Sequence, residues 1–325
     1  MYSVKKIAVL TSGGDAPGMN ACIRAVIRAC AHYNLEVFGI HRGYQGLIEN
    51  EIFPMTPSSV ANIIQMGGTI LKTARSKEFI TAEGRSKAHE NLKAKGIEGL
   101  VCIGGNGTYT GAMIFEKEFG LPSIGCPGTI DNDLWGTDAT IGYDTAINTA
   151  MEAIDKIRDT ADAHNRVFFI EVMGRHSGHI ALHAGIAGGA EGIFIPERGN
   201  EFTDIVKLYE SKARKKEFSI FVVAEGEEEG HAYDIAKRFQ SIYPDTDCKV
   251  TVLGHIQRGG RPTANDRILA SRLGAHAVKA LIEGQKNHAV GVVDNQIKFT
   301  SFQEAIERKK DIQDNLWTLN TIITR

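Results

Sequence analysis

Short apolar runs alternate with longer helix-favouring stretches along most of the chain. The apolar runs have the length of buried strands and lie at residues 7–10, 35–41, 99–103, 121–126, 167–172, 192–195, 219–224 and 250–253. Helical patterns fill spaces between them, at residues 19–33, 58–66, 86–95, 109–119 and 145–160. Strands that alternate with helices favour parallel sheets with helices on both faces, so the pattern predicts an α/β protein. We expect two α/β lobes, with the change between them near residues 141–145.

Composition narrows the class of protein without changing this fold prediction. The chain has 325 residues, enough for two domains, and its hydrophobic and charged contents of 42% and 23% are ordinary for a globular protein. A net charge of -2 does not suit a nucleic-acid binder, so no nucleic-acid partner is expected. We expect no membrane span, because no apolar stretch reaches about eighteen residues, and no signal peptide. The five cysteines favour reduced thiols and a cytoplasmic location.

Glycine-rich turns follow three of the predicted strands. Their sequences are SGGD at residues 12–15, GGNG at 104–107 and PGT at 127–129. Glycine in such a turn leaves backbone N–H groups free to meet phosphate oxygens, and the following helix adds a positive N-terminal end. Neither the Walker A spacing nor the dinucleotide-binding spacing occurs. The turns therefore predict a phosphorylated ligand.

Two carboxylates stand directly after one of these turns. Asp131 and Asp133 belong to the run PGTIDND, which follows the strand predicted at residues 121–126. Open α/β sheets bind their ligands at the carboxyl ends of strands. The run therefore predicts one carboxylate that takes a proton from a substrate hydroxyl and another that faces or supports a metal ion.

Three arginines supply positive charge near the glycine turns. Arg75, Arg175 and Arg258 each stand beside glycines close to a predicted strand or apolar run. Guanidinium groups suit bidentate contacts with phosphate, which agrees with the predicted ligand. His255 precedes Arg258 and is either a structural histidine or a donor to a sugar hydroxyl or phosphate.

Together these motifs resemble bacterial ATP-dependent 6-phosphofructokinases. The shared runs are TSGGDAPGMN at residues 11–20, PGTIDND at 127–133, EVMGR at 171–175 and GHIQRGG at 254–260, in the same order and spacing. The resemblance extends from about residue 6 to about residue 305. It implies the phosphofructokinase fold: two doubly wound, Rossmann-like α/β lobes with the active site in the cleft, in a homotetramer. The implied lobes are a larger ATP-binding lobe, residues 1–142 plus about 257–307, and a smaller fructose-6-phosphate-binding lobe, 143–256 plus about 308–325.

The resemblance implies transfer of a phosphoryl group from ATP to the 1-hydroxyl of D-fructose 6-phosphate, which is the committed step of glycolysis. Asp131 matches the catalytic base, and Thr129 matches a residue that holds the transferring group. Arg75 and Arg175 match cations that neutralise the charge of that group. Gly14 completes the implied catalytic set.

The resemblance also implies three sets of binding residues. The ATP set is Gly14, Arg75, Ser76, Gly105, Asn106, Gly107 and Thr108. The sugar-phosphate set is Thr129, Asp131, Arg166, Met173, Gly174, Arg175, Glu225, Lys249, His255 and Arg258. The magnesium set is Asn106 and Asp133. In the family the counterpart of Arg166 reaches the 6-phosphate from a neighbouring subunit, so the active site would require at least a dimer.

A second implied site lies between subunits and binds ADP or phosphoenolpyruvate as an effector. The matching residues are Arg24, Arg28, Arg158, Gly189, Glu191, Arg214 and Lys216. A family arginine is Pro57 here, and a family aspartate is Asn62. We therefore expect effector control to be altered or absent.

Two departures concern the active site. The family's magnesium-linked aspartate is Asn106 here, and an amide keeps an acceptor oxygen without the negative charge. We expect an active kinase that requires more magnesium than family members with an aspartate at this position. Lys249 replaces a usual arginine, so the charge remains and the bidentate fork is lost. These changes leave open a catalytically weakened regulatory paralogue, although the intact Asp131 counts against it.

Two glycines bear on the phosphoryl donor. Pyrophosphate-dependent relatives usually carry an aspartate at the position of Gly107 and a lysine at that of Gly128. Glycine at both positions favours ATP, and a pyrophosphate-dependent phosphofructokinase stays an alternative. A small-molecule kinase of the NAD-kinase type shares the Gly-Gly-Asp turn, but it would not account for PGTIDND or GHIQRGG.

Overall fold

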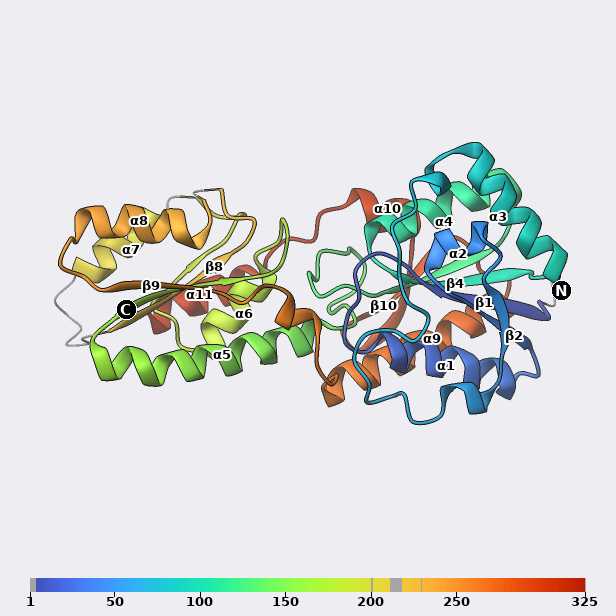
Figure 1. The fold of residues 1–325 in the computed structure, drawn as a ribbon, viewed down its shortest axis with the longest axis horizontal. Coiled ribbons are helices and arrows are strands. Elements are labelled where there is room, and N and C mark those ends of the chain that lie inside the picture. The colour runs from blue at the N-terminus through green and yellow to red at the C-terminus, as the bar shows by residue number, and fades with distance from the viewer. Residues whose placement is uncertain (1–3, 200, 211–217, 229, 325) are drawn as a thin grey trace. The chain divides into compact units, whose positions relative to one another are not determined.

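The computed structural model describes residues 4–199, 201–210, 218–228 and 230–324 (Figure 1). The chain separates into two compact units. Unit 1 is formed by Met1–Ile130, Leu134–Thr145 and Arg258–Lys309, and unit 2 by Asp131–Asp133, Ala146–Gln257 and Lys310–Arg325. The three residues of the DND run thus cluster with unit 2, although the chain on both sides of them belongs to unit 1. Which ligand each unit binds stays a prediction.

Unit 1 is built on a mainly parallel sheet. Among the described residues its seven strands follow the order β11-β10-β5-β4-β1-β2-β3. Their bounds are β1 (Lys6–Thr11), β2 (Glu36–Ile40), β3 (Ile52–Met55), β4 (Gly99–Gly104), β5 (Ser123–Pro127), β10 (His288–Val293) and β11 (Gln296–Ser301). The two edge strands, β3 and β11, are antiparallel to their neighbours. The carboxyl ends of β1, β4 and β5 therefore lie side by side, with Leu10 opposite Cys102 and Cys102 opposite Gly125.

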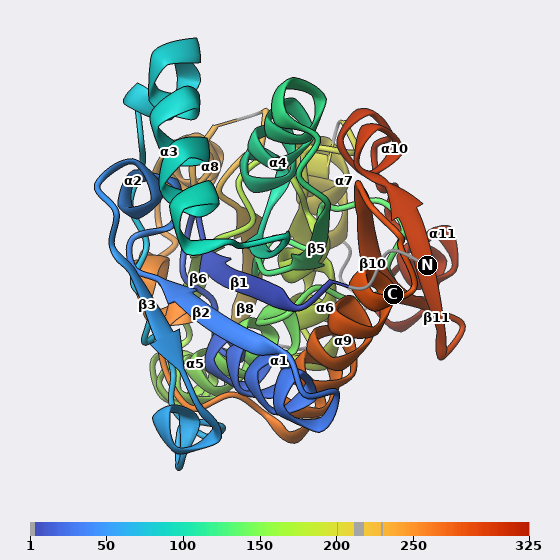
Figure 2. The same ribbon diagram turned by 90° about the vertical axis from the view of Figure 1, so that its right-hand side faces the viewer.

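Helices cover both faces of this sheet (Figure 2). On one face, α1 (Met19–His32) packs against α9 (Ala264–Ile282). On the other face lie α2 (Gly43–Ile48), α3 (Ala82–Lys95), α4 (Asn106–Phe119) and α10 (Phe302–Glu307). The second face buries an aromatic cluster that includes Tyr44, Tyr109 and Phe115. Short 3₁₀ turns η1 (Pro57–Val60) and η2 (Glu78–Ile80) border a long connection without helix or strand.

Unit 2 has a smaller, fully parallel sheet. Its described strands are β6 (Val167–Val172), β7 (Gly192–Phe194), β8 (Ser219–Ala224) and β9 (Cys248–Val252), in the order β7-β8-β6-β9. Its helices are α5 (Tyr143–His164), which starts in unit 1, α6 (His179–Ala187), α7 (Glu201–Glu210), α8 (Ala232–Ile242) and α11 (Asp314–Ile323). Buried Phe169, Phe221 and Phe239 join the sheet to α7 and α8. The 3₁₀ turn η3 (Gly254–Arg258) follows β9.

The predicted α/β class with two lobes is confirmed, and most predicted strands and helices are present. The helix predicted at residues 58–66 is wrong, because only η1 forms there. Asn62 adopts a φ of 56°, and the Asn20 amide donates to the carbonyls of Met66 and Gly67, so tertiary hydrogen bonds replace helical ones.

Sequence reasoning missed three strands of unit 1. β3 contains Pro54, which disfavours a strand assignment and suits the edge position it holds. β10 and β11 form a hairpin whose turn residues, Asp294 and Asn295, have φ of 49° and 61°. Positive φ at both central residues is the signature of a tight hairpin turn, so the Asp-Asn pair was a usable signal. None of the helices in the described part of the chain is long and apolar enough to cross a membrane.

Candidate functional site

The turn after β1 brings a glycine next to an arginine from a distant part of unit 1. A Cβ added to Gly14 would lie 3.5 Å from Cζ and Nη1 of Arg258, so the guanidinium group faces the glycine backbone. Gly14 is exposed and Arg258 half-buried. The family resemblance implies that Arg258 binds the sugar phosphate and Gly14 binds ATP, and the structure brings these two residues together.

The turn after β4 leads into the N-terminus of α4. Thr108 Oγ1 donates to the carbonyl of Ser12 at 3.1 Å, which ties this turn to the turn after β1. A Cβ on Gly107 would meet no atom within 4 Å, so this glycine borders open space. The first turn of α4 carries no acidic residue, and its N-terminal end keeps its positive partial charge. These features suit an anionic group such as a phosphate.

The turn after β5 closes against the same strand ends. The N–H of Gly128 donates to the carbonyl of Gly104 at 3.0 Å, and the hydroxyl of Thr140 donates to the carbonyl of Thr129 at 2.6 Å. Thr129 lies across from Gly105, whose added Cβ would contact its Cβ at 3.8 Å. Gly128 itself is buried, and a Cβ there would come within 2.9 Å of Met19 Cε. Any side chain at this position would therefore require Met19 and its neighbours to shift, so packing as well as the phosphoryl donor favours glycine here.

Residues 131–133 form a short bend within unit 2. Asn132 is buried with a φ of 54°, and Lys310 Nζ donates to its Oδ1 at 2.8 Å. The carbonyl of Asp131 accepts from the hydroxyl of Ser177 at 3.1 Å. The bend directs the Asn132 side chain inward, and Asp131 and Asp133 on either side of it are only half-buried. These contacts hold the backbone of the bend from which the two carboxylates project.

The carboxyl ends of β6 and β8 carry a second group of predicted sugar-phosphate residues. The N–H of Met173 donates to Gln257 Oε1 at 2.8 Å, and the N–H of Arg175 donates to Glu225 Oε1 at 2.8 Å. Arg175 has a φ of 60° and an exposed side chain. The tight turn therefore fixes the backbone of Arg175 while its guanidinium group stays accessible. Sequence reasoning missed Gln257, which is fully buried and follows the exposed His255 within η3.

The amino ends of β6 and β9 carry the remaining predicted phosphate ligands. Arg166 Nε lies 2.7 Å from Asp247 Oδ2, and Lys249 Nζ lies 2.6 Å from Asp247 Oδ1. The hydrogen bond from Lys249, which has the larger effect, and the one from Arg166 lower the pKa of the Asp247 carboxyl. The six-residue strand β6 spans about 20 Å, so this basic pair lies at the opposite end of the unit 2 sheet from Arg175. Within unit 2 the predicted sugar-phosphate residues at the two ends of the sheet therefore form separate groups.

The predicted effector residues are only partly brought together. Arg158 Nη2 on α5 donates to the carbonyls of Gly188 and Gly189, the latter at 2.9 Å. Glu191 is buried and accepts from the N–H of Ile220 at 2.7 Å. Arg24 and Arg28 lie on α1 in unit 1. Arg214 and Lys216 lie outside the described residues.

The described residues contain no cluster of three or more His, Cys, Asp or Glu side chains that would hold a metal ion. The predicted magnesium ligands are a carboxylate, Asp133, and an amide, Asn106. Mg²⁺ in proteins usually takes one or two carboxylates and completes its shell with water and substrate phosphates. This donor set fits a magnesium ion that arrives with a nucleotide, and it does not fit a dedicated protein cage.

Comparisons with known proteins identify relatives over nearly the whole chain. Residues 6–281 match the family model described as Phosphofructokinase. The chain is 54% identical over 317 residues to the ATP-dependent 6-phosphofructokinase of Cytophaga hutchinsonii, covering 97% of each. It is 56% identical over 321 residues to ATP-dependent 6-phosphofructokinase 1 of Thermus thermophilus, covering 98% of this chain and 99% of the relative.

Solved structures agree with these matches. The Saccharomyces cerevisiae phosphofructokinase superposes with a TM-score of 0.87 at 38% identity, covering 98% of this chain and 46% of that one. This chain thus spans about half the length of the yeast chain. A pyrophosphate-dependent phosphofructokinase from Marinobacter aquaeolei has a TM-score of 0.84 at 23% identity, over 96% of this chain and 86% of that one, and shows the fold alone.

Proposed function

Because the chain belongs to the phosphofructokinase family, we propose that it is an ATP-dependent 6-phosphofructokinase. It would transfer the γ-phosphoryl group of ATP to the 1-hydroxyl of fructose 6-phosphate, as a step of glycolysis. The observation that carries this proposal is the identity above 50% over nearly the full length to relatives named for that activity. The resemblance stated from the motifs is confirmed. The pyrophosphate-dependent structures are more distant, which favours ATP as the donor.

The residues of unit 1 are assigned to the nucleotide phosphates. The N-terminus of α4, with Gly107 bordering open space, would donate backbone N–H groups to phosphate oxygens. Gly14, Gly105 and Thr108 would complete this cradle. Arg75 would neutralise charge on the transferring group, and Arg258 is positioned to add a second cation beside Gly14.

The residues of unit 2 are assigned to the acceptor hydroxyl and the sugar. Asp131 would take the proton from the 1-hydroxyl as that oxygen attacks the γ-phosphorus. Asp131 lies in a bend whose backbone is held by the Lys310 and Ser177 hydrogen bonds, so the backbone that carries its half-buried carboxylate is already in place before the reaction. Arg175 would neutralise the developing charge, and Glu225 fixes the Arg175 backbone.

Asp133 and Asn106 would hold magnesium together with the nucleotide phosphates. Bound there, the ion would neutralise phosphate charge and orient the nucleotide. Since Asn106 lacks the negative charge of a carboxylate, we propose that the enzyme requires more magnesium than a relative with aspartate at this position.

We also propose that Arg166 and Lys249 act as a pair on the 6-phosphate bound to a neighbouring subunit. Both contact Asp247 at the amino end of the unit 2 sheet, away from Arg175. A homotetramer would allow this exchange between subunits. Any effector, such as ADP or phosphoenolpyruvate, would bind near Arg158. We also propose a cytoplasmic location.

A coupled assay for fructose 1,6-bisphosphate tests the reaction. We expect turnover with ATP and fructose 6-phosphate at saturating magnesium, and a loss of about 10²- to 10⁴-fold in kcat for Asp131→Asn. Turnover with pyrophosphate in place of ATP would overturn the donor assignment. A wild-type protein that binds ATP and fructose 6-phosphate without turnover would favour the regulatory paralogue.

A further inference from the structure

The segment that carries Arg75 contains no helix or strand. Hydrogen bonds from side chains of other elements hold its backbone instead. Upstream of it, Asn20 binds the carbonyls of Met66 and Gly67 and accepts from the N–H of Ile70 at 2.8 Å. Thr11 Oγ1 then donates to the carbonyl of Lys72 at 2.8 Å. We call residues 72–77 the Arg75 segment. Its first fixed point is the Lys72 carbonyl at its beginning.

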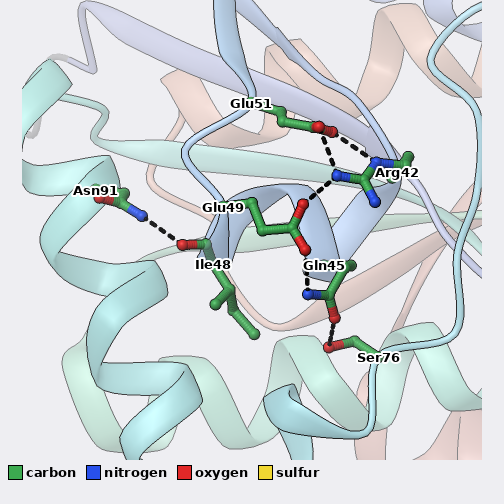
Figure 3. Close-up of polar contacts among 7 residues, drawn as sticks. All are labelled: Arg42, Gln45, Ile48, Glu49, Glu51, Ser76 and Asn91. Carbon is green, nitrogen blue, oxygen red and sulfur yellow. Dashed lines mark hydrogen bonds and ion pairs between the residues drawn. The ribbon is translucent and has the colours of Figure 1, made fainter.

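The second fixed point is Ser76, which is hydrogen-bonded to Gln45 (Figure 3). The Ser76 hydroxyl donates to Gln45 Oε1 at 2.7 Å and accepts from the N–H of Phe79 at 3.1 Å. Arg75 lies between the two fixed points with an exposed side chain, and within the described residues this side chain makes no hydrogen bond or ion pair. The backbone is thus held on both sides of an arginine that remains available to a ligand.

The Gln45 amide has a defined orientation. Its Nε2 donates to Glu49 Oε1 at 2.7 Å, which leaves Oε1 to accept from Ser76. Gln45 and then Arg42 lower the pKa of Glu49, so this group is an ionised carboxylate that only accepts hydrogen bonds. A flipped amide would place two acceptors together at Glu49. The hydrogen-bond chemistry therefore fixes which end of Gln45 faces Ser76.

Further contacts fix Glu49 and the short helix α2 (Figure 3). Arg42 donates to Glu49 and, through Nε at 2.9 Å, to Glu51. Asn91 on α3 donates to the carbonyls of Leu47 and Ile48 at 2.8 and 3.1 Å, which holds the last turn of α2. The helix that carries Gln45 is therefore anchored at both ends.

The same helix also contacts the phosphate cradle. Tyr44, adjacent to Gln45, donates its hydroxyl to the carbonyl of Thr108 at 2.5 Å, and its ring stacks on Phe79 at 4.1 Å. Helix α2 thus contacts the N-terminus of α4 through Tyr44 and the Arg75 segment through Gln45. It sets the position of one relative to the other within unit 1.

We propose that Gln45 is a positioning residue for nucleotide phosphates, which acts through Ser76 to fix the backbone of Arg75. This inference rests on the proposed function, in which Arg75 neutralises charge on the transferring phosphoryl group. Ser76 then contributes to nucleotide binding mainly by holding the segment, since its hydroxyl hydrogen is donated to Gln45. The network consists of residues outside the assigned active-site set, apart from Ser76.

Steady-state kinetics on four variants test the proposal in the full-length oligomer. The variants are Gln45→Ala, Ser76→Ala, the double variant and the control Gln303→Ala. Gln303 donates to Glu307 four residues later at 3.2 Å, so it matches the Gln45–Glu49 pair without touching a predicted site. Loss of one hydrogen bond predicts that kcat/KM for ATP falls about fivefold in Gln45→Ala, with the KM for fructose 6-phosphate unchanged. In the Ser76→Ala background the Gln45 change should have no further effect.

Amide hydrogen exchange supplies a readout that does not depend on activity. We expect faster exchange in the Arg75 segment of Gln45→Ala and unchanged exchange there in Gln303→Ala. If Gln45→Ala matches the control in exchange and in kcat/KM, the proposal is wrong. It is also wrong if the kinetic loss persists in full without the Ser76 hydroxyl. Absence of wild-type turnover would instead contradict the proposed function, and the exchange result would still decide whether Gln45 fixes the segment.

Discussion

A buried histidine beside the DND bend predicts how stability depends on pH. His179, at the N-terminus of α6, is 2% exposed, and burial, with a smaller contribution from the charge of Lys310, lowers its pKa to about 4. An unfolded histidine titrates near 6.5. Below that pH the unfolded chain binds a proton at His179 that the folded chain does not bind. This contribution to the free energy of unfolding is therefore present above pH 6.5 and is lost as pH falls toward 4. The difference of about 2.5 pKa units corresponds to about 3 kcal/mol over the whole window.

Urea unfolding at pH 7.0 and pH 5.0 measures this loss. The chain has two tryptophans, Trp135 in unit 1 and Trp317 in unit 2, so a Trp135→Phe background leaves a reporter in the unit that contains His179. We expect wild-type unit 2 to lose about 2 kcal/mol more than His179→Gln between these pH values. The variant His276→Gln is the control, because His276 lies on α9 in unit 1. Equal pH dependence in wild type and His179→Gln would refute the reasoning.

Two further predictions concern the proposed active site. Asn106→Asp adds a charge to the magnesium set, and we expect the magnesium concentration for half-maximal activity to fall about tenfold; an unchanged titration would contradict weakened magnesium binding. We expect Asp131→Asn and Arg166→Ala each to have little activity alone. Mixed oligomers of the two should recover about a quarter of wild-type activity, because intact Asp131 and intact Arg166 then meet across an interface. No recovery in verified mixed oligomers would place both residues in one subunit's site.

The parts of the fold that were predictable depend on local sequence alone. The strand at residues 167–172 was predicted with its observed bounds because a compact, mainly apolar run follows the polar residues Asn165 and Arg166 and ends shortly before Gly174. The position of the three glycine turns at strand ends was also predicted, whereas the sheet order that makes these strands neighbours was not. Gly14, Gly105 and Thr129 indeed follow β1, β4 and β5, which are neighbours in the sheet.

Contacts between distant side chains could not be predicted. The segment after residue 58 reads as helical, but the Asn20 amide captures its carbonyls from another element. Gln45 has no sequence feature that marks it, since its contact with Ser76 exists only because α2 lies beside the Arg75 segment. The approach of Arg258 to Gly14 likewise depends on the whole of unit 1. The roles of the site residues stay predictions until the variants are measured.

The position of the basic pair gives a physical reason for subunit exchange, once both groups of residues are assigned to the same sugar phosphate as the family resemblance implies. Arg166 and Lys249 flank β6 and β9 at their amino ends, whereas Arg175 and Glu225 follow β6 and β8 at their carboxyl ends. A sugar phosphate is much shorter than the roughly 20 Å of a six-residue strand, so one molecule cannot contact both groups of the same unit. If both groups bind the same substrate, one must come from a second copy of the chain. In the isolated subunit the carboxylate of Asp247 holds the two cations, which keeps them together until a phosphate competes for them.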